Sequence, residues 1–99
     1  MIVYISGPMT GIEDYYSKFH SVQERLETLG YNVINPAFHM DKLPKLTYEQ
    51  FMKVDLALLD AADAIFMLEG WENSKGANRE YGYALASNKI IIFEDEVNH

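Results

Sequence analysis

The sequence predicts an α/β fold in which helices cover both faces of a short parallel β-sheet. Short β-branched and aromatic runs alternate along the chain with segments whose apolar residues recur at helical spacing. This β-α-β-α-β-α-β order is typical of parallel strands joined by right-handed crossovers. We expect a flavodoxin-like three-layer sandwich with the strand order 2-1-3-4. The chain has 99 residues, so one domain over residues 1–99 is expected.

The first crossover unit begins with a strand over residues 1–6, which ends at a Gly-Pro pair. Residues 7–11 are rich in glycine and proline and predict a loop. A helix is expected from about residue 14 to residue 29, with Gly30 as the residue that ends it. The stripe that should face the core is Phe19, Val22, Leu26 and Leu29.

The second unit starts with a strand over residues 31–35, which a proline stops, followed by a long loop over residues 36–46. Thr47 and Gln50 have the spacing of a capping box and mark the start of the next helix. Its expected core stripe is Phe51, Val54, Leu58 and Ala61.

The last part of the chain predicts a strand over residues 63–68, a polar turn over 69–74 and a helix over 76–87. A fourth strand is expected over residues 89–93, and the acidic tail 94–99 is expected to fray. The inward side of the helix is assigned to Ala77, Tyr81, Ala84 and Leu85.

Composition excludes several functions. Eight Lys and Arg against 15 Asp and Glu give a net charge of −7, which argues against binding to a nucleic-acid polymer. The absence of cysteine excludes disulfides and thiol catalysis. No apolar run approaches the ~20 residues that span a membrane, and the start of the chain lacks signal-peptide features, so we expect a cytoplasmic protein without membrane contact. His20 and His39 have no metal-site spacing, and neither a metal nor another cofactor is expected.

Ligands of such sheets bind beyond the carboxyl ends of the strands, near the switch point between the first and third strands. The predicted fold brings three segments there: residues 6–11, the loop after Asn35, and residues 69–76. The glycines of the first loop let the backbone approach a ligand, and its N–H groups can hold an anion, although the spacing alone favours an ordinary strand-to-helix turn. The candidate ligand-binding residues of this loop are Gly7, Pro8, Met9, Thr10 and Gly11.

Two carboxylates fall on helix faces that should be buried. Asp55 lies on or beside the core stripe of its helix, and Glu80 shares a face with Ala77 and Ala84. A buried carboxylate is costly unless it is hydrogen-bonded or used in chemistry. The alternatives are that Asp55 reaches solvent at the flank, and that Glu80 pairs with Arg79 or Lys75.

The start of the last helix is a candidate anion site. Ser74 can cap this helix, and together with Lys75 and Gly76 it can seat a phosphate at the helix N-terminus. Capping alone is the simpler alternative. Trp71, on the loop just before, can stack on a base or cover the edge of the core.

These motifs resemble the nucleoside 2-deoxyribosyltransferase-like superfamily, and especially a branch of small phage and bacterial proteins of unassigned function. The resemblance covers essentially the whole chain. Its most specific part is Ser74-x-Gly76-x-x-x-Glu80-Tyr81-Gly82-Tyr83-Ala84, and it also includes Val3-Tyr4-Ile5-Ser6-Gly7-Pro8-Met9-Thr10-Gly11, Asn35-Pro36-Ala37 and Asp55.

The resemblance implies roles for individual residues. The glutamate at Glu80 is the nucleophile that attacks the anomeric carbon and displaces the base. The aspartate at Asp55 assists at the sugar, and the tyrosine at Tyr4 orients the catalytic acid. The loop over residues 7–11 lines the sugar and its 5′ end.

The position of Ser74 separates two branches of this superfamily. Transferases of free nucleosides carry an acid there, whereas 2′-deoxynucleoside 5′-monophosphate N-glycosidases carry a serine that meets the phosphate. The chain departs from the phosphate branch at Thr10, where an arginine is usual, and Lys75 is a candidate to compensate. The implied function is N-glycosidic cleavage or base transfer on such a nucleotide, by a homodimer or larger homo-oligomer. The alternative is a non-catalytic nucleotide-binding or phage accessory protein of the same fold.

Overall fold

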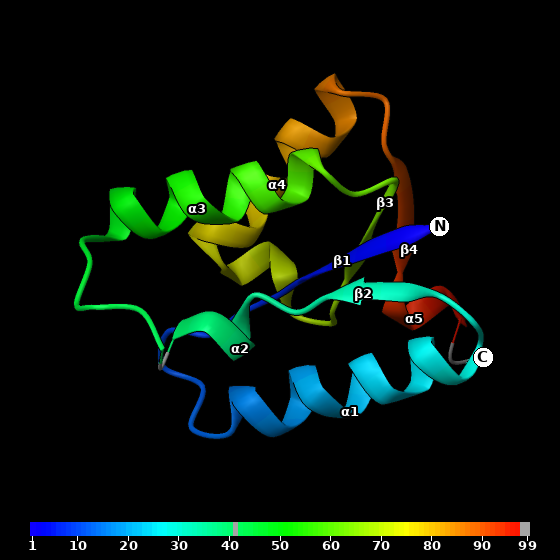
Figure 1. Cartoon of the computed structure of the whole chain (residues 1–99), viewed down its shortest axis with the longest axis horizontal. Coiled ribbons are helices and arrows are strands. Elements are labelled where there is room, and N and C mark those ends of the chain that lie inside the picture. Colours follow the sequence, from blue (N-terminus) through cyan, green and yellow to red (C-terminus); the bar gives the residue numbers. More distant parts are fainter. Residues whose placement is uncertain (41, 98–99) are drawn as a thin grey trace.

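The computed structural model describes residues 1–40 and 42–97, and its centre is one four-stranded sheet (Figure 1). All paired strands are parallel, and their order is β2-β1-β3-β4. This confirms the α/β class, the strand order 2-1-3-4 and the flavodoxin-like arrangement. The strands are β1 (Ile2–Ser6), β2 (Asn32–Ile34), β3 (Ala64–Met67) and β4 (Ile90–Phe93).

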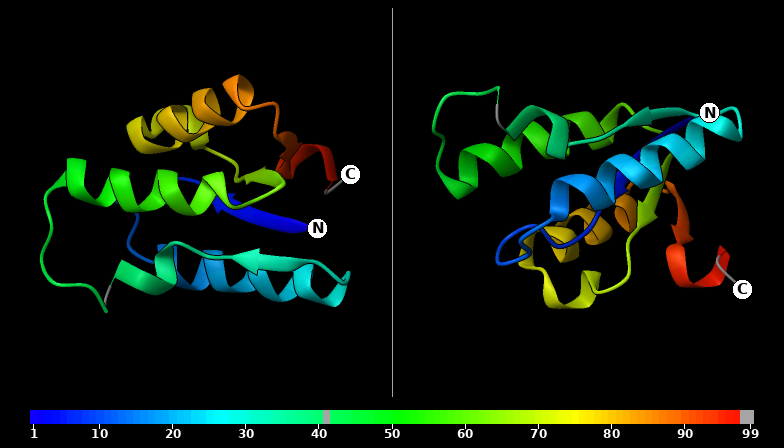
Figure 2. Two further views of the ribbon diagram at one scale, coloured as in Figure 1. Left: turned by 45° about the horizontal axis from the view of Figure 1, so that its top comes forward. Right: turned by 90° about the horizontal axis from the view of Figure 1, so that it is seen from below.

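Helices cover both faces of the sheet, as Figure 2 shows with α1 on one side of β1 and α3 and α4 on the other. Val3 and Ile5 of β1 pack in the core beneath α1, whereas Tyr4 belongs to the core beneath α3 and α4. Successive strand residues point to opposite faces, so β1 contributes to both layers. The helices are α1 (Tyr15–Thr28), α2 (Ala37–Met40), α3 (Tyr48–Asp60), α4 (Lys75–Ala86) and α5 (Glu94–Val97), with a 3₁₀ turn, η1 (Trp71–Asn73).

The ends of the long helices follow the sequence signals. Thr47 Oγ1 accepts from the N–H of Gln50 at 3.2 Å, and Gln50 Oε1 accepts from the N–H of Thr47 at 2.8 Å, so the capping box is confirmed. Gly30 follows α1 with φ +94°, a conformation that favours glycine. Leu29, placed in the core stripe by its spacing, is instead 72% exposed, because the helix has ended and the chain turns away.

The core stripe of α3 is shifted by one residue from the predicted one. Met52 and Leu59 are buried, and Ala62 just beyond the helix is buried too. The stripe that faces the sheet is therefore 52, 55, 59 and 62, and the prediction was wrong by about 100° around the helix axis. Its second position is Asp55, so a carboxylate takes the place of an apolar residue. The expected members Phe51, Val54 and Leu58 are half-buried and Ala61 is exposed.

Helix α4 packs through small residues. Ala77 and Ala84 are buried as expected, and Glu80 is buried between them. Tyr81 is half-buried, whereas Leu85 is 51% exposed, so its assignment to the inward side was wrong. Glu80 therefore occupies a buried position of α4 for which the hydrophobic pattern predicts no apolar residue.

Two further segments differ from expectation. The loop over residues 36–46 contains the short helix α2, with residue 41 outside the described part. The tail does not fray where it is described. Helix α5 forms, and its Glu94 is buried, with Lys18 Nζ at 2.6 Å from one oxygen and the N–H of Glu69 donating to the other at 2.8 Å. Residues 98–99 of the predicted tail lie outside the described residues. In the described part, none of the helices has the length and apolar character needed to cross a membrane.

Candidate active site

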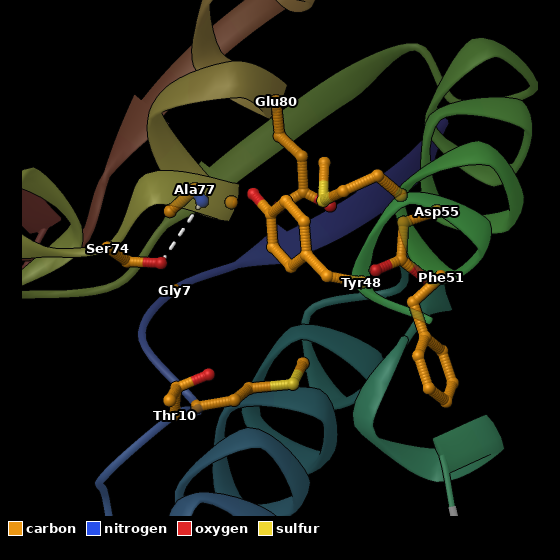
Figure 3. A pocket seen from close by; sticks show the side chains of 11 residues that line it. Gly7, Thr10, Tyr48, Phe51, Asp55, Ser74, Ala77 and Glu80 are labelled. Atoms are coloured by element: carbon orange, nitrogen blue, oxygen red, sulfur yellow. Dashed lines mark hydrogen bonds between the residues drawn. The ribbon is translucent and has the colours of Figure 1, made fainter. Parts of the chain in front are cut away.

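A cleft of about 200 Å³ lies at the carboxyl end of β1, between the N-terminal parts of α3 and α4 (Figure 3). It is the place that the parallel sheet predicts for a ligand. Its wall is formed by Gly7, Met9 and Thr10 of the first loop, Tyr48, Phe51, Met52 and Asp55 of α3, and Ser74, Gly76, Ala77 and Glu80 at the start of α4.

Glu80 is held by two hydroxyl groups of one strand. Tyr4 Oη donates to Glu80 Oε2, and Ser6 Oγ donates to Oε1 at 2.7 Å. Neither Arg79 nor Lys75 forms an ion pair with it; Arg79 pairs with a different carboxylate. The alternative of a surface ion pair therefore does not apply to Glu80.

Burial dominates the ionisation of Glu80. Loss of solvation raises the pKa of its carboxyl to about 7, although the hydrogen bonds from Tyr4 and Ser6 favour the charged form. Burial and the neighbouring carboxylates of Glu80 and Asp55 hold the pKa of Tyr4 well above its usual value. Tyr4 consequently stays a hydrogen-bond donor over the physiological range.

Asp55 is the second carboxylate of the cleft, and its side chain extends from α3 toward it (Figure 3). It is half-buried, and no residue in the described ranges hydrogen-bonds or ion-pairs with it. Burial raises the pKa of Asp55 to about 6. A carboxylate on a core-facing stripe without a partner is costly for folding, which is typical of a functional residue.

The start of α4 forms the opposite wall. Ser74 Oγ accepts from the N–H of Ala77 at 3.1 Å, so the predicted helix cap is confirmed, and both residues line the cleft. Gly76 lies so close to α3 that an added Cβ would be 3.4 Å from Met52 Sδ. Lys75 does not line the cleft, and its Nζ lies 5.3 Å from the centre of the Tyr48 ring.

The predicted first loop reaches the cleft in part. Gly7, Met9 and Thr10 line it, whereas Pro8 and Gly11 do not. Packing also explains why residue 7 is a glycine, because an added Cβ would lie 2.7 Å from Leu68 Cβ. The glycine therefore lets the first loop lie directly against the end of β3.

Trp71 is placed outside the cleft lining. Its ring centre lies 4.7 Å from that of Tyr81 and 6.1 Å from that of Phe93. Of the two roles that the sequence leaves open, this aromatic cluster matches covering the edge of the core, and stacking on a base stays a prediction.

Several residues of the site were assigned no individual role from the sequence, including Ser6 within the segment 6–11. Ser6 had a usable signal, because it follows Tyr4 by two residues and so shares its face of β1. Tyr48, Phe51 and Met52 carried no such signal, since only the docking of α3 beside α4 brings them to the cleft. The described residues contain no group of three or more His, Asp or Glu side chains arranged to hold a metal.

Fold and cleft together define a flavodoxin-like α/β protein with two carboxylates at the switch point of its sheet. The chain belongs to the family described as domain of unknown function DUF4406, which matches residues 1–93. No curated protein matches the chain. The matched range includes every residue of the cleft.

Proposed function

We propose that the protein cleaves the N-glycosidic bond of a 2′-deoxynucleoside 5′-monophosphate, or transfers its sugar to a second base, with Glu80 as nucleophile. The observation that carries this proposal is the buried Glu80 carboxylate, fixed by Tyr4 and Ser6 and sharing a cleft with the unpartnered Asp55. Two carboxylates facing one cleft are the groups that displacement at an anomeric carbon requires. The likeness to nucleoside 2-deoxyribosyltransferases supports the same reading and stays a prediction.

The reaction proceeds in two displacements. A Glu80 oxygen forms a bond to the anomeric carbon while the bond from that carbon to the base nitrogen breaks, and the base leaves with the electron pair. Asp55, with its pKa raised to about 6, can carry the proton that the departing base takes up. Water then attacks the same carbon, gives a proton to the Asp55 carboxylate and releases the Glu80 carboxylate, which gives hydrolysis. A second base that attacks in place of water and loses its proton in the same way gives transfer. Negative charge near the sugar stabilises the oxocarbenium-like transition state.

The phosphate belongs at the start of α4 in this proposal. Ser74 and Gly76 line that end of the cleft, and Lys75 stands between them in sequence. Because the net charge is −7, a dianionic ligand needs a local site of this kind to overcome general repulsion.

We further propose that the protein works as a homodimer or larger homo-oligomer in the cytoplasm. A chain of 99 residues has a thin core. Four large apolar side chains of the described residues are each more than half exposed: Leu29, Leu85, Ile90 and Val97. Contact with a second copy would bury such side chains.

A non-catalytic nucleotide-binding or phage accessory role is the second candidate, and Thr10 favours it. Thr10 lines the cleft at a place where the phosphate-specific enzymes of the resembled superfamily carry an arginine. A binding protein needs no nucleophile. Catalytic release of the base therefore distinguishes the enzyme from the binding protein.

The deciding experiment incubates the protein with the four 2′-deoxynucleosides and their 5′-monophosphates and follows released base by chromatography. Release from one or more monophosphates, faster than from the matching nucleoside, is the expected result. Binding of a monophosphate without any release would favour the second candidate. Release from nucleosides alone would move the protein to the transferase branch.

A further inference from the structure

Tyr48 connects the two helices that form the cleft. It is the first residue of α3 and lines the cleft, and its hydroxyl approaches the start of α4, where a Cβ on Gly76 would lie 3.7 Å from it. Figure 3 shows its ring across the middle of the cleft, between Ser74 and Asp55. The side chain thus borders the end of the cleft that Ser74 and Gly76 form.

Two cations of α4 lie against the Tyr48 ring. Lys75 Nζ is 5.3 Å from the ring centre and Arg79 Cζ is 5.6 Å from it, both within the range of cation–π attraction. Their remaining contacts differ. Arg79 Nη1 lies 3.0 Å from Glu49 Oε1, and this pair ties α4 to the first turn of α3. Lys75 has no carboxylate partner in the described part of the chain, despite the excess of acidic residues.

The contact between Lys75 and the Tyr48 ring lies close to the cleft. Its sequence neighbours Ser74 and Gly76 line the cleft, and its ammonium group lies 5.3 Å from the centre of the Tyr48 ring, which borders the same end of the cleft. A free lysine side chain has large rotamer entropy, which binding a phosphate would otherwise have to remove. The Tyr48 ring restricts Lys75 before any ligand arrives, and such preorganisation increases affinity.

We propose that Tyr48 is a specificity-determining positioning residue, which holds Lys75 in place to recognise the 5′-phosphate of the ligand. The proposal rests on the proposed function for the identity of the ligand. It assigns the discrimination between nucleotide and nucleoside to a pair of residues, one on each helix. Thr10 need not supply the missing positive charge, because Lys75 supplies it from the start of α4, beside the cleft.

Binding of the four 2′-deoxynucleoside 5′-monophosphates and their nucleosides, measured by calorimetry, tests this pair. For the best ligand, the unmodified protein should bind the monophosphate at least about 10-fold more tightly than the nucleoside. Tyr48→Phe keeps the ring and should keep this ratio. Tyr48→Leu and Lys75→Met should each reduce it to about threefold or less, with no change in kcat but a higher KM for the monophosphate. Lys53→Met, an exposed lysine of α3, is the matched control and should change nothing.

The double variant gives the sharpest result. If Tyr48 acts through Lys75, Tyr48→Leu adds no further loss once Lys75→Met is present, and the two effects are strongly non-additive. Independent, additive losses would overturn the proposal. An unchanged ratio of monophosphate to nucleoside affinity in Tyr48→Leu would also overturn it. If base release from monophosphates continued in that variant, the proposed function would still stand. Equal affinity for nucleotide and nucleoside in the unmodified protein would overturn this proposal and the phosphate specificity together.

Discussion

Ser6 Oγ donates a 2.7 Å hydrogen bond to Oε1 of Glu80, a residue 74 positions further along the chain. Tyr4, on the same face of β1, donates to the other oxygen. One strand therefore fixes both oxygens of the carboxylate before a ligand arrives. In the proposed reaction this orientation removes a rearrangement that the nucleophile would otherwise have to make.

Replacing the nucleophile should abolish turnover. Glu80→Gln keeps the shape, and the hydroxyls of Tyr4 and Ser6 can each accept as well as donate a hydrogen bond, so the side chain stays accommodated. We expect base release to fall at least ~1000-fold, equivalent to ~4 kcal/mol in the activation barrier. Initial rates with the best monophosphate measure this, and the exposed Glu13→Gln is the control. Near-normal release from Glu80→Gln would remove Glu80 from the mechanism.

The same carboxylate should make stability depend on pH. Its pKa is about 7 in the folded protein against 4.5 as the ordinary value, so the folded state keeps a proton that the unfolded chain loses between these pH values. The free energy of unfolding must then decrease as pH rises from about 4.5 to about 7, by on the order of 3 kcal/mol for this group.

Glu80→Gln removes this dependence, and urea unfolding at pH 5 and pH 8 measures it. Relative to the unmodified protein, the variant should gain stability at pH 8 and gain much less at pH 5. Asp55 is present in both proteins, so the comparison reports the ionisation of Glu80 together with its electrostatic coupling to Asp55. A difference in stability that stays constant between the two pH values would show that burial does not shift this group.

A change at Ser74 should reverse the preference for phosphate. Ser74→Asp keeps an N-cap for α4, because aspartate caps helices as well as serine does. The introduced carboxylate repels a phosphate, and its oxygens can accept a hydrogen bond from a free 5′-hydroxyl. The ~10-fold preference for monophosphate, about 1.4 kcal/mol, should disappear or change sign in calorimetric titrations. Ser87→Asp, on an exposed residue at the other end of α4, is the control.

If the protein self-associates, its mass in solution should exceed the mass of one chain. Light scattering at micromolar concentration should give a whole-number multiple, two or more, of the 11.4 kDa chain mass. Ile90→Lys should shift the mass toward one chain, because Ile90 is 53% exposed on a strand at the edge of the sheet. Ile12→Lys, on an exposed loop isoleucine, should leave the mass unchanged. A monomer that folds cooperatively and binds nucleotide would contradict the oligomer.

The fold was predictable because its signals are local: the alternation of strands and helices, the capping box at Thr47 and the glycine after α1. The inward side of α3 was not, because the neighbouring stripes that begin at Phe51 and at Met52 both carry apolar residues. The stripe that faces the sheet contains Asp55. Because a carboxylate is polar, the hydrophobic pattern favours the neighbouring stripe, which has no charged residue. A cleft in the wall of the core makes the charge tolerable, and only the assembled fold reveals the cleft.

The two carboxylates, the first loop and the start of α4 were predicted at the site, whereas the neighbours of Asp55 on α3 were not, for a related reason. Glu80 interrupts a face of small residues, which is visible along the sequence. The role of Tyr48 depends on the docking of α3 beside α4, and the placement of Trp71 depends on Tyr81 and Phe93. Such contacts join distant segments and leave no periodic trace.

Gly7 and Thr10 give the first loop very different tolerance to change during evolution. At Gly7 even a methyl group would meet Leu68 at 2.7 Å, so drift at this position would separate the loop from β3 and widen the cleft. Thr10 lies three residues further on and is exposed at the rim, where new side chains meet solvent and ligand instead of the core. New ligand preferences in this lineage can therefore arise at Thr10, while the rigid end of the loop keeps the cleft in place.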